Sequence, residues 1–508
     1  MSDILSKIVE LRTENIKQNG FTMGVNIPSE RLRPVHPFLQ DKGVILEVKR
    51  ASPSKGDIAP ELDSYNTALS YAESGAGAIS CLTERNFFKG DLSDLMNVCA
   101  AVDEYERQTG KTGPAVLRKD FLITEEDIDV ACRAGADAVL LICRILSKEK
   151  IVSMARRAAS YGMTSLVEVR LEEDVEKLKL VCGSVDPSYI VCGVNSRDLS
   201  DFTIDLLKPC FMLEKIKKVL GQNARVIFES GIRTPESAAF VSSLGFKGLL
   251  LGEAAAKNPS IRKELVHSFK TSLSDANARF WLNYSFSFEE RTAKKLPLVK
   301  ICGLTNSNDA QMAVKNGADF LGFIFYDKSP RHVNSDEAEK LLDELKEVKA
   351  VKAGVIVNPD DKEARVAIDL CRRGKLDVLQ LHTFECAEKF ISDKNLRVLP
   401  HYAAVNISSQ EDVKKLDFLF DMGEPRVLAD AAVKGTAVGG TGNCIDENLV
   451  KSVQKKYPLW IAGGLTPDNV RSVVSSFNPE LIDCAGGVEE VPGKKSSIKL
   501  ENFFSELK

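Results

Sequence analysis

The sequence lacks several features that would place it in other protein classes. It has no run of about 18 apolar residues, so no membrane-spanning helix is expected. Its first residues lack the apolar core of a signal peptide. Its 12 cysteines include no Cys-x-x-Cys pair, so they predict neither a zinc site nor a disulfide framework. The net charge of -4 and the pI near 6.0 give no sign of nucleic-acid binding. We therefore expect a cytoplasmic protein that binds neither membranes nor nucleic acids.

The first half of the chain alternates short apolar runs with amphipathic helical patterns. Eight strands are expected, at residues 44–49, 78–82, 115–118, 138–142, 165–169, 190–194, 225–229 and 248–251. Eight β/α units in about 210 residues predict a (β/α)8 barrel. The alternative is an open doubly wound sheet, which usually carries a glycine-rich nucleotide fingerprint after its first strand. No Gly-x-Gly-x-x-Gly follows Lys49, and this favours the barrel.

The alternation restarts at Pro297. Eight more strands are expected, at residues 298–302, 320–325, 352–357, 378–381, 396–399, 426–429, 459–462 and 481–483. A second barrel of the same class follows from this count. The predicted fold class is therefore α/β, with two consecutive (β/α)8 TIM barrels. The motifs of the two halves differ, so the chain is not a recent internal duplication.

The chain of 508 residues is accordingly divided into three parts. Residues 1–257 form the first barrel, residues 258–296 a linker that is partly helical, and residues 297–508 the second barrel. Within the linker, we expect Phe280 and Trp281 to pack against a barrel, since large aromatic side chains mostly serve packing.

Charged and polar residues stand at the carboxyl ends of the expected strands of the first half. They are Glu47, Lys49, Lys119, Glu168, Asn195, Arg197 and Glu229. Taken singly, a pair such as Glu47 and Lys49 could be a solvated surface ion pair. Barrel enzymes, however, place their chemistry at this end of the barrel, and unpaired buried charges are costly. We therefore predict that these side chains converge on one site, where lysine and glutamate act as acid and base on an anionic substrate.

Glycine-containing turns follow the last two strands of the first barrel. They contain Ser230 with Gly231 after strand seven and Gly252 after strand eight. In barrels of this class, backbone N–H groups at these positions commonly bind phosphate. The alternative is that these glycines only turn the chain.

Motifs of this half resemble the indole-3-glycerol-phosphate synthase family over about residues 1–265. They are Leu46-Glu47-x-Lys49-x-x-Ser52-Pro53-Ser54, Leu117-Arg118-Lys119-Asp120-Phe121, Val167-Glu168-Val169, Asn195-x-Arg197-Asp198-Leu199 and Glu229-Ser230-Gly231-Ile232. This family closes an anthranilate ring that bears a deoxyribulose phosphate onto the sugar carbonyl, with loss of CO₂ and water. The resemblance implies that a helix over residues 4–18 caps the barrel mouth.

The resemblance also implies individual roles. Lys119 would be the general acid for ring closure, Glu168 the base for the later proton removal, and Lys49 would hold the carboxylate and assist dehydration. Residues expected to position the substrate or the lysines are Glu47, Ser52, Phe121, Asn195, Arg197, Glu229, Ser230, Gly231 and Gly252. One departure is Ala254, where the family pattern leads us to expect a serine.

The second half also has polar residues at its expected strand ends. Cys302 ends the first of these strands and Asp430 ends the sixth. A cysteine there is either inert core or one half of an acid–base pair, since a tuned thiol titrates near neutral pH. His382, after the fourth strand, is either a hydrogen-bonded structural residue or a ligand. The glycine-rich loop at residues 439–442 could cradle an anion, which is weak evidence alone.

These motifs resemble the phosphoribosylanthranilate isomerase family over about residues 297–508. They are Lys300-Ile301-Cys302-Gly303, Ser329-Pro330-Arg331, Gln380-Leu381-His382, Asp430, Gly439-Gly440-Thr441-Gly442 and Ala462-Gly463-Gly464-Leu465. By resemblance, Cys302 is the base that takes the C2′ proton, Asp430 is the acid that opens the ribose ring, and Arg331 binds the anthranilate carboxylate. Further substrate contacts are expected from Gln380, His382, Gly463, Gly464 and Gly486. The loop 483–489 lacks the expected serines, which we expect at most to weaken phosphate binding.

The two resemblances together imply two consecutive steps of tryptophan biosynthesis, because the product of the second barrel is the substrate of the first. We expect a monomer that acts on phosphorylated anthranilate-sugar substrates without a metal or redox cofactor. Three alternatives remain open. The second barrel could be catalytically inactive, although Cys302 and Asp430 argue against this. It could catalyse the related isomerisation of histidine biosynthesis, for which a pair of aspartates is expected. The chain could also only bind sugar phosphates.

Overall fold

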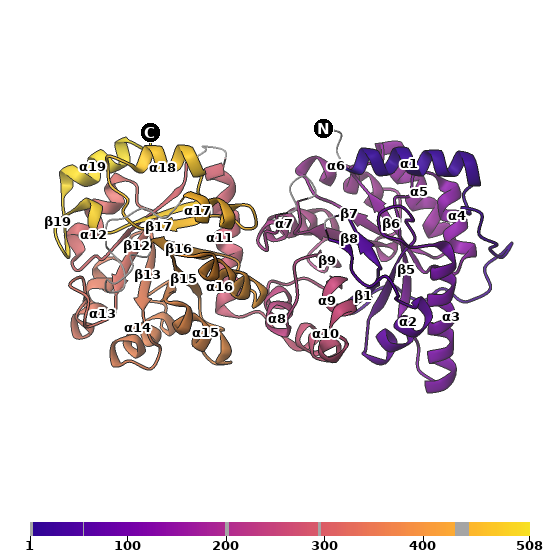
Figure 1. The fold of residues 1–508 in the computed structure, drawn as a ribbon, viewed down its shortest axis with the longest axis horizontal. Helices are drawn as coiled ribbons and strands as arrows, with labels where there is room; N and C mark the ends of the chain where they lie inside the picture. Colours follow the sequence, from indigo (N-terminus) through magenta and orange to yellow (C-terminus); the bar gives the residue numbers. More distant parts are fainter. Residues whose placement is uncertain (1–3, 54, 199–202, 293–295, 432–446) are drawn as a thin grey trace. The chain divides into compact units, whose positions relative to one another are not determined.

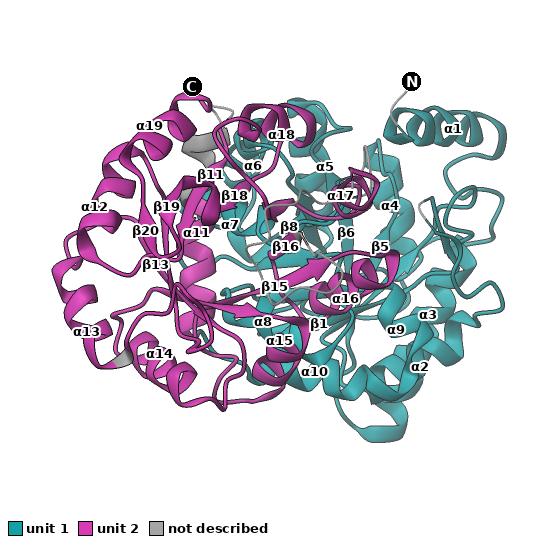
Figure 2. Ribbon diagram, turned by 60° about the vertical axis from the view of Figure 1, so that its left-hand side comes forward, with its two compact units in different colours: residues 1–274 teal, residues 275–508 magenta. Residues whose placement is uncertain are grey.

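The computed structural model describes residues 4–53, 55–198, 203–292, 296–431 and 447–508. The chain divides into two compact units, residues 1–274 and 275–508 (Figure 2). Each unit is built around a closed barrel of eight strands surrounded by helices (Figure 1). The expected pair of (β/α)8 barrels is therefore confirmed. None of the helices in the described ranges is both long and apolar enough to cross a membrane.

The barrel of the first unit has all eight expected strands, and none of their ends is displaced by more than one residue. They are β1 (Gly43–Val48), β4 (Ala78–Leu82), β5 (Ala115–Lys119), β6 (Ala138–Ile142), β7 (Thr164–Glu168), β8 (Ile190–Asn195), β9 (Val226–Glu229) and β10 (Gly248–Leu251). All neighbouring strands are parallel, and β1 closes the barrel by pairing with both β4 and β10. Parallel strands are covered on both faces, which explains their nearly continuous apolar sequences.

Helices connect these strands and cover the barrel. They are α2 (Ser64–Glu73), α3 (Leu92–Thr109), α4 (Glu125–Arg133), α5 (Lys148–Ser160), α6 (Glu172–Cys182), α7 (Lys208–Leu220), α8 (Pro235–Ser243), the short α9 (Glu253–Lys257) and α10 (Arg262–Thr271). Gly75, Gly135 and Gly245 follow helices α2, α4 and α8 with φ values of +84°, +98° and +95°. Glycine adopts this left-handed backbone at little cost, so each of these residues ends a helix and turns the chain toward the next strand.

The leading helix α1 (Ile4–Asn19) is fastened to the first barrel by a buried arginine. Arg12 lies 2.5 Å from Asp127 and 3.3 Å from Asp120 in ion pairs with both carboxylates. Leu5 and Ile8 of the same helix are buried in the apolar cluster of the barrel interior. A charged and an apolar contact therefore fix this helix to the barrel.

The barrel of the second unit is closed by pairing of its first and last strands. Its strands are β11 (Leu298–Cys302), β12 (Phe320–Ile324), β13 (Val351–Ile356), β14 (Val378–His382), β15 (His401–Ile407), β16 (Val427–Ala431), β17 (Trp460–Ala462) and β18 (Leu481–Cys484). Its helices are α12 (Ser307–Asn316), α13 (Ser335–Glu344), α14 (Lys362–Arg372), α15 (Phe384–Ser392), α16 (Gln410–Asp421), α17 (Glu447–Gln454), α18 (Val470–Phe477) and α19 (Ser497–Ser505).

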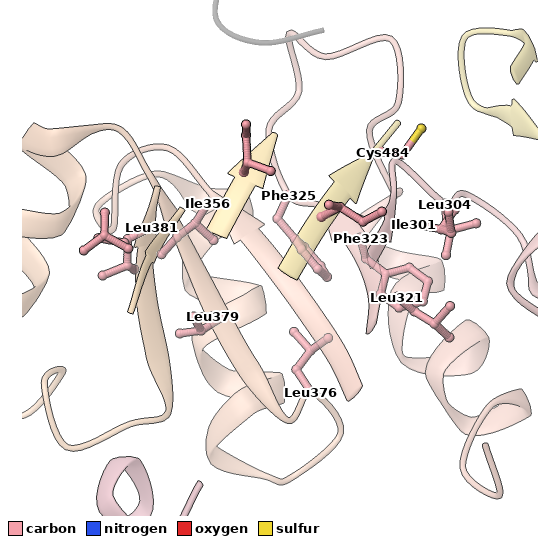
Figure 3. Packing of buried hydrophobic residues seen from close by; sticks show 14 of the residues in the cluster. Ile301, Leu304, Leu321, Phe323, Phe325, Ile356, Leu376, Leu379, Leu381 and Cys484 are labelled. Carbon is pink, nitrogen blue, oxygen red and sulfur yellow. The ribbon is translucent and has the colours of Figure 1, made fainter. Parts of the chain in front are cut away.

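Most outward-facing side chains of this barrel are apolar and pack under the helices. Leu321, Phe323, Leu379 and Leu381 belong to this layer (Figure 3). Because strand side chains alternate, the intervening residues point into the barrel. The sequence of each strand therefore separates a packing face from an interior face.

One expected strand of the second barrel is wrong. Residues 396–399 form turns, and the fifth strand is β15, which begins at His401. The apolar run at 396–399 resembles a strand, but Pro400 follows it and the amides of Leu396 and Leu399 are used in turn hydrogen bonds. The true strand contains two adjacent alanines, which are weak strand formers, and it is stabilised by pairing with β14 and β16.

The segment expected to be a linker is shared between the two units. Helix α10 belongs to the first unit, where Ser242 of α8 donates a hydrogen bond to the Phe269 carbonyl at 2.7 Å. Helix α11 (Ala276–Thr292) belongs to the second unit. Trp281 is fully buried there, and its ring centroid lies 6.0 Å from that of Trp460, the first residue of β17. This confirms the expected packing of Trp281, which covers the amino-terminal end of the second barrel.

Replacing Trp281 with alanine should destabilise the second unit by about 3–5 kcal/mol, because it leaves a large cavity beneath the barrel. Trp281→Phe should cost clearly less, since the buried indole Nε1 has no hydrogen-bond partner among the described residues. Urea unfolding followed by the fluorescence of Trp460 measures both changes, because the chain has only two tryptophans. Equal losses for the two variants would contradict a packing role.

Candidate active sites

The interior of the first barrel changes from apolar to charged toward the carboxyl ends of its strands. Ile45, Leu117, Leu166 and Ile227 are interior residues of the apolar cluster. Two residues further along the same strands, and thus on the same face, stand Glu47, Lys119, Glu168 and Glu229. The alternation within each strand therefore places four ionisable side chains in one layer above an apolar floor.

Two lysines and two buried glutamates form the centre of this layer. Lys49 Nζ lies 2.6 Å from Glu47 Oε1, and Lys119 Nζ lies 3.3 Å from both Glu47 Oε2 and Glu229 Oε2. Glu47 and Glu229 are each only 1% exposed. Charges this deeply buried are tolerated because each has an oppositely charged partner. Lys119 is held between two carboxylates, and Lys49 is held by one.

The protonation states in this layer follow from burial and from these pairs. Burial by itself would raise the pKa of Glu47, but Lys119 and Lys49 bring it down to about 2. Burial lowers the pKa of Lys119, yet the carboxylates around it outweigh this and raise the pKa above its usual value. Burial and the Glu229 carboxylate raise the pKa of Glu168 to about 7. The site therefore combines a firmly protonated lysine with a glutamate that titrates near neutral pH.

A cavity of about 180 Å³ opens at this layer and collects the expected residues of the first barrel. Its lining includes Glu47, Lys49, Ser52, Lys119, Phe121, Glu168, Asn195, Arg197, Ser230, Gly231 and Gly252. Glu229 is the exception among the expected residues, because it contacts Lys119 without lining the cavity. It therefore orients the lysine.

The turns after β9 and β10 form a cationic end of the cavity. Ser230 and Gly231 have φ values of +73° and +83°, so the backbone turns sharply at the carboxyl end of β9. The cations Lys55 and Arg233 line the same cavity. Burial raises the pKa of the nearby Glu253, but Lys257, and to a smaller extent Lys55 and Arg233, lower it below its usual value. Backbone turns beside fixed cations suit a phosphate group.

Sequence reasoning missed two groups of residues in this cavity. The first is the cations Lys55 and Arg233. The closeness of Arg233 to the expected phosphate turn at Ser230 and Gly231 was an available signal, whereas Lys55 follows the first strand. The second is an apolar wall of Ile4, Leu5, Ile8, Phe88, Leu140 and Ile142. Nothing in the sequence separates these residues from ordinary core residues. The wall includes Ile4, Leu5 and Ile8 of α1, so this helix lines the cavity at the barrel mouth.

The second barrel has its own cavity, of about 490 Å³, at the carboxyl ends of its strands. All expected residues of this half line it: Cys302, Arg331, Gln380, His382, Asp430, Gly463, Gly464 and Gly486. The expected loop 439–442 lies outside the described residues. Gly463 and Gly464 have φ values of +101° and +62°, and a Cβ on Gly487 would lie 1.9 Å from the Leu465 carbonyl oxygen. The turns after β17 and β18 thus pack against each other, which only glycine permits.

A buried polar network lies beneath this cavity. Lys300 is fully buried, and its Nζ donates to Gln380 Oε1 at 2.5 Å and to Asp483 Oδ2 at 2.6 Å. The Tyr402 hydroxyl also donates to Gln380 Oε1, at 2.9 Å. Burial, together with the charge of Lys300, lowers the pKa of His382 to about 4, so its ring is neutral at physiological pH. Sequence reasoning assigned no role to Lys300 or Asp483, although Lys300 shares a strand face with Cys302.

Arg331 is engaged by a glutamate that sequence reasoning did not identify. Its Nε lies 3.0 Å from both Glu489 carboxylate oxygens, and its Nη2 lies 2.8 Å from Oε2. Glu489 also pairs with the buried Lys495 at 2.8 Å, and Lys495 donates to the carbonyl oxygens of Cys302 and Ala485. The guanidinium still lines the cavity, so Glu489 holds it in place at the mouth.

No metal site was identified in the described parts of the chain, where no three His, Cys, Asp or Glu side chains are grouped as ligands. Both cavities instead collect acid–base side chains and glycine turns at the carboxyl ends of barrel strands. This arrangement defines the class: two TIM-barrel units built for acid–base chemistry on anionic small molecules.

Comparison with known proteins identifies both units. Residues 13–268 match the family model for indole-3-glycerol phosphate synthase, and residues 299–506 match that for N-(5'-phosphoribosyl)anthranilate isomerase. The chain therefore belongs to the family of fused tryptophan biosynthesis enzymes that join these two domains.

Three relatives illustrate the range of this family. The multifunctional tryptophan biosynthesis protein of Schizosaccharomyces pombe is 32% identical over 94% of this chain and 60% of its own length. The tryptophan biosynthesis protein TRP1 of Phytophthora nicotianae is 30% identical over 89% of this chain and 90% of its own. TrpCF of Vibrio parahaemolyticus is 29% identical over 100% of this chain and 95% of its own. The chain thus spans somewhat over half of the first relative and nearly all of the other two.

Replacing Gly193 with alanine should lower the synthase kcat/KM by about tenfold or more. A Cβ at this position would lie 2.2 Å from Glu229 Oε1, so the carboxylate that orients Lys119 would be displaced. Gly183→Ala is the matched control, because its Cβ would meet no described atom closer than 3.5 Å. Steady-state assays of ring closure compare the two variants. A Gly193 variant with normal kcat/KM would show that Glu229 is not needed where it stands.

Proposed function

We propose that this chain catalyses two consecutive reactions of tryptophan biosynthesis. The second unit isomerises N-(5-phosphoribosyl)anthranilate to 1-(2-carboxyphenylamino)-1-deoxyribulose 5-phosphate. The first unit converts this product to indole-3-glycerol phosphate. One observation carries the proposal: the two family matches fall on separate barrels, and each barrel gathers the acid–base residues expected for its family around its own cavity.

In the second unit, Asp430 and Cys302 are the proposed acid and base. Asp430 protonates the ribose ring oxygen as its bond to C1′ breaks, and the nitrogen lone pair forms a C=N bond. The Cys302 thiolate then takes the C2′ proton, so that a C1′=C2′ bond forms and the C=N electron pair returns to nitrogen. The enolamine loses its hydroxyl proton and gains a proton at C1′, which yields the ketone. Both residues line the same cavity.

In the first unit, Lys119 is the proposed general acid. The ring carbon that bears the carboxylate attacks the C2′ carbonyl carbon, and Lys119 protonates the carbonyl oxygen. The CO₂ leaves and its bonding pair restores the aromatic ring. Glu47 and Glu229 lie beside Lys119 and keep it charged and in place. The raised pKa keeps Lys119 protonated, so that a proton is available for the basic oxygen that forms.

The final dehydration in the first unit is assigned to Glu168 and Lys49. Glu168 takes the C1′ proton, and the hydroxyl at C2′ leaves as water with a proton from Lys49. Both side chains line the cavity. Ser230, Gly231 and Gly252 would bind the phosphate with Lys55 and Arg233 beside them. The opposite wall is apolar, which suits the anthranilate ring.

The competing function is a monofunctional synthase whose second barrel is only structural. The absence of the expected serines from residues 485–487 is the observation that would favour it. Against it stand Cys302 and Asp430, which share an intact cavity. An isomerase of the histidine pathway is disfavoured because Cys302 occupies the position where an aspartate is expected.

We propose further that the chain acts as a monomer in the cytoplasm and binds no nucleic acid. The net charge of -4 supports the last point. The cysteines in the described part of the chain are all free, as is usual in a reducing compartment.

The basic test supplies phosphoribosylanthranilate as sole substrate and follows its fluorescence together with indole glycerol phosphate formation. Lys119→Ala should lower the rate of indole glycerol phosphate formation by roughly 10²-fold or more and leave isomerisation intact. Cys302→Ala should show the reverse pattern when each half-reaction is assayed separately. Loss of both activities in either variant, with the chain still folded, would contradict independent sites.

Formation of indole-3-glycerol phosphate should depend on pH through Glu168, which acts in the dehydration step. A general base must be ionised, and the pKa of Glu168 is raised to about 7, so the synthase kcat should fall about tenfold per pH unit below pH 7. Glu168→Gln should lower kcat by roughly 10²-fold to 10⁴-fold and remove this limb of the profile. The measurement is kcat for indole-3-glycerol phosphate formation by the first unit from pH 5 to pH 9. An unchanged acid limb in the Gln variant would assign it to another group.

A further inference from the structure

Lys300 is a charged side chain deep inside the second barrel. It is fully buried, and the described partners of its Nζ are Gln380 Oε1 and Asp483 Oδ2. Burying a lysine costs several kcal/mol even when it is paired, and an apolar pair of similar volume often stabilises a fold as well or better. Packing alone therefore does not explain why this position carries an ammonium group.

The ammonium group lies directly beneath the proposed catalytic thiol. Lys300 and Cys302 are two residues apart on β11, so both point into the barrel. A Cβ added to Gly322 on the neighbouring strand would lie 2.6 Å from Cys302 Sγ and 3.0 Å from Lys300 Cε. Both side chains therefore pack against Gly322 on β12, where the absence of a side chain leaves the space that they occupy.

We propose that Lys300 is a positioning residue of the isomerase, whose charge stabilises the thiolate of Cys302 while Asp483 and Gln380 hold the ammonium in place. This inference rests on the proposed function, in which Cys302 is the base. The thiol proton passes to solvent through the open cavity, and the thiolate then accepts the C2′ proton.

The other charged groups around Cys302 act in both directions. Asp483 on β18 opposes the thiolate, and Lys495 on the short strand β20 (Lys494–Lys495) favours it. Other ionisable groups that line the same cavity are Tyr326, Arg331, His382, Asp430, Glu489 and Glu490. Tyr402 on β15 lies beside Lys300 and Cys302. Burial raises the pKa of Cys302, and Lys300 is the largest influence that lowers it. The direction of the electrostatic effect thus agrees with the geometry.

The test uses the full chain and compares Asp483→Asn with the double variant Lys300→Met, Asp483→Asn. This pair isolates the lysine charge, because neither variant leaves an unpaired buried carboxylate at position 483. The reporter is the pH midpoint of alkylation of Cys302 by iodoacetamide, read on the Cys302 peptide by mass spectrometry. Lys352→Met is the matched control, since Lys352 is a buried lysine of the same barrel that does not line the cavity.

In Asp483→Asn the midpoint should move to lower pH, because the opposing carboxylate is gone. In the double variant it should lie at least about one pH unit above that of Asp483→Asn. The isomerase kcat at pH 7 should then fall about tenfold relative to Asp483→Asn, with little change in KM. Lys352→Met should leave the midpoint unchanged.

Equal midpoints in the two Asn variants would overturn the role of Lys300. If the double variant does not fold, Lys300→Gln, Asp483→Asn replaces it, because it also removes the lysine charge but keeps a polar side chain at position 300, and a midpoint equal to that of Asp483→Asn again contradicts the proposal. A midpoint that shifts as expected in a chain that cannot isomerise phosphoribosylanthranilate would instead overturn the proposed function. The alkylation assay needs no catalytic activity, so the two failures are distinguishable.

Discussion

Charge compensation inside a closed barrel is the constraint on which both sites depend. Closing eight parallel strands brings their inward-facing side chains together in layers, away from water. Any charge placed there needs a partner of opposite sign. In the first barrel, Glu47 and Glu229 hold Lys119, and in the second Asp483 holds Lys300. The ionisable groups available for chemistry are thus embedded in networks that also determine their protonation.

The two barrels apply this constraint at different depths. In the first, the charges form a layer above an apolar floor that includes Ile45 and Leu117. In the second, the ion pair of Lys300 lies one layer below Cys302, and an aromatic layer that includes Trp460 closes the bottom. The first arrangement keeps Lys119 charged at the cavity itself. In the second, the charge of Lys300 lies beneath the Cys302 thiol.

Segments outside the barrels complete each unit. Helix α1 places Ile4, Leu5 and Ile8 over the first cavity, and the pairing of Arg12 with Asp127 anchors it. Helix α11 covers the second barrel through Trp281, at the amino-terminal end, which is the end away from that barrel's cavity. One added helix therefore shapes a substrate cavity, and the other protects a core.

Local patterns in the sequence were enough to predict the two barrels and the proposed site residues that line the cavities. Alternating apolar runs and glycine stops mark barrel strands, and the carboxyl ends of these strands predicted Lys119, Glu168, Cys302 and Asp430 as candidates, because these signals are local in the chain. The strand at His401–Ile407 was missed since its propensity is weak and only its neighbours stabilise it.

The contacts between these groups, in contrast, could be read only from the folded barrels. The pairing of Arg331 with Glu489, the position of Asp483 beneath Cys302 and the apolar wall from α1 join residues far apart in sequence. No local pattern encodes such a contact, because barrel closure alone brings these side chains together. The pKa of Glu168 also depends on barrel closure, since Glu168 is buried and lies near Glu229 only in the closed barrel.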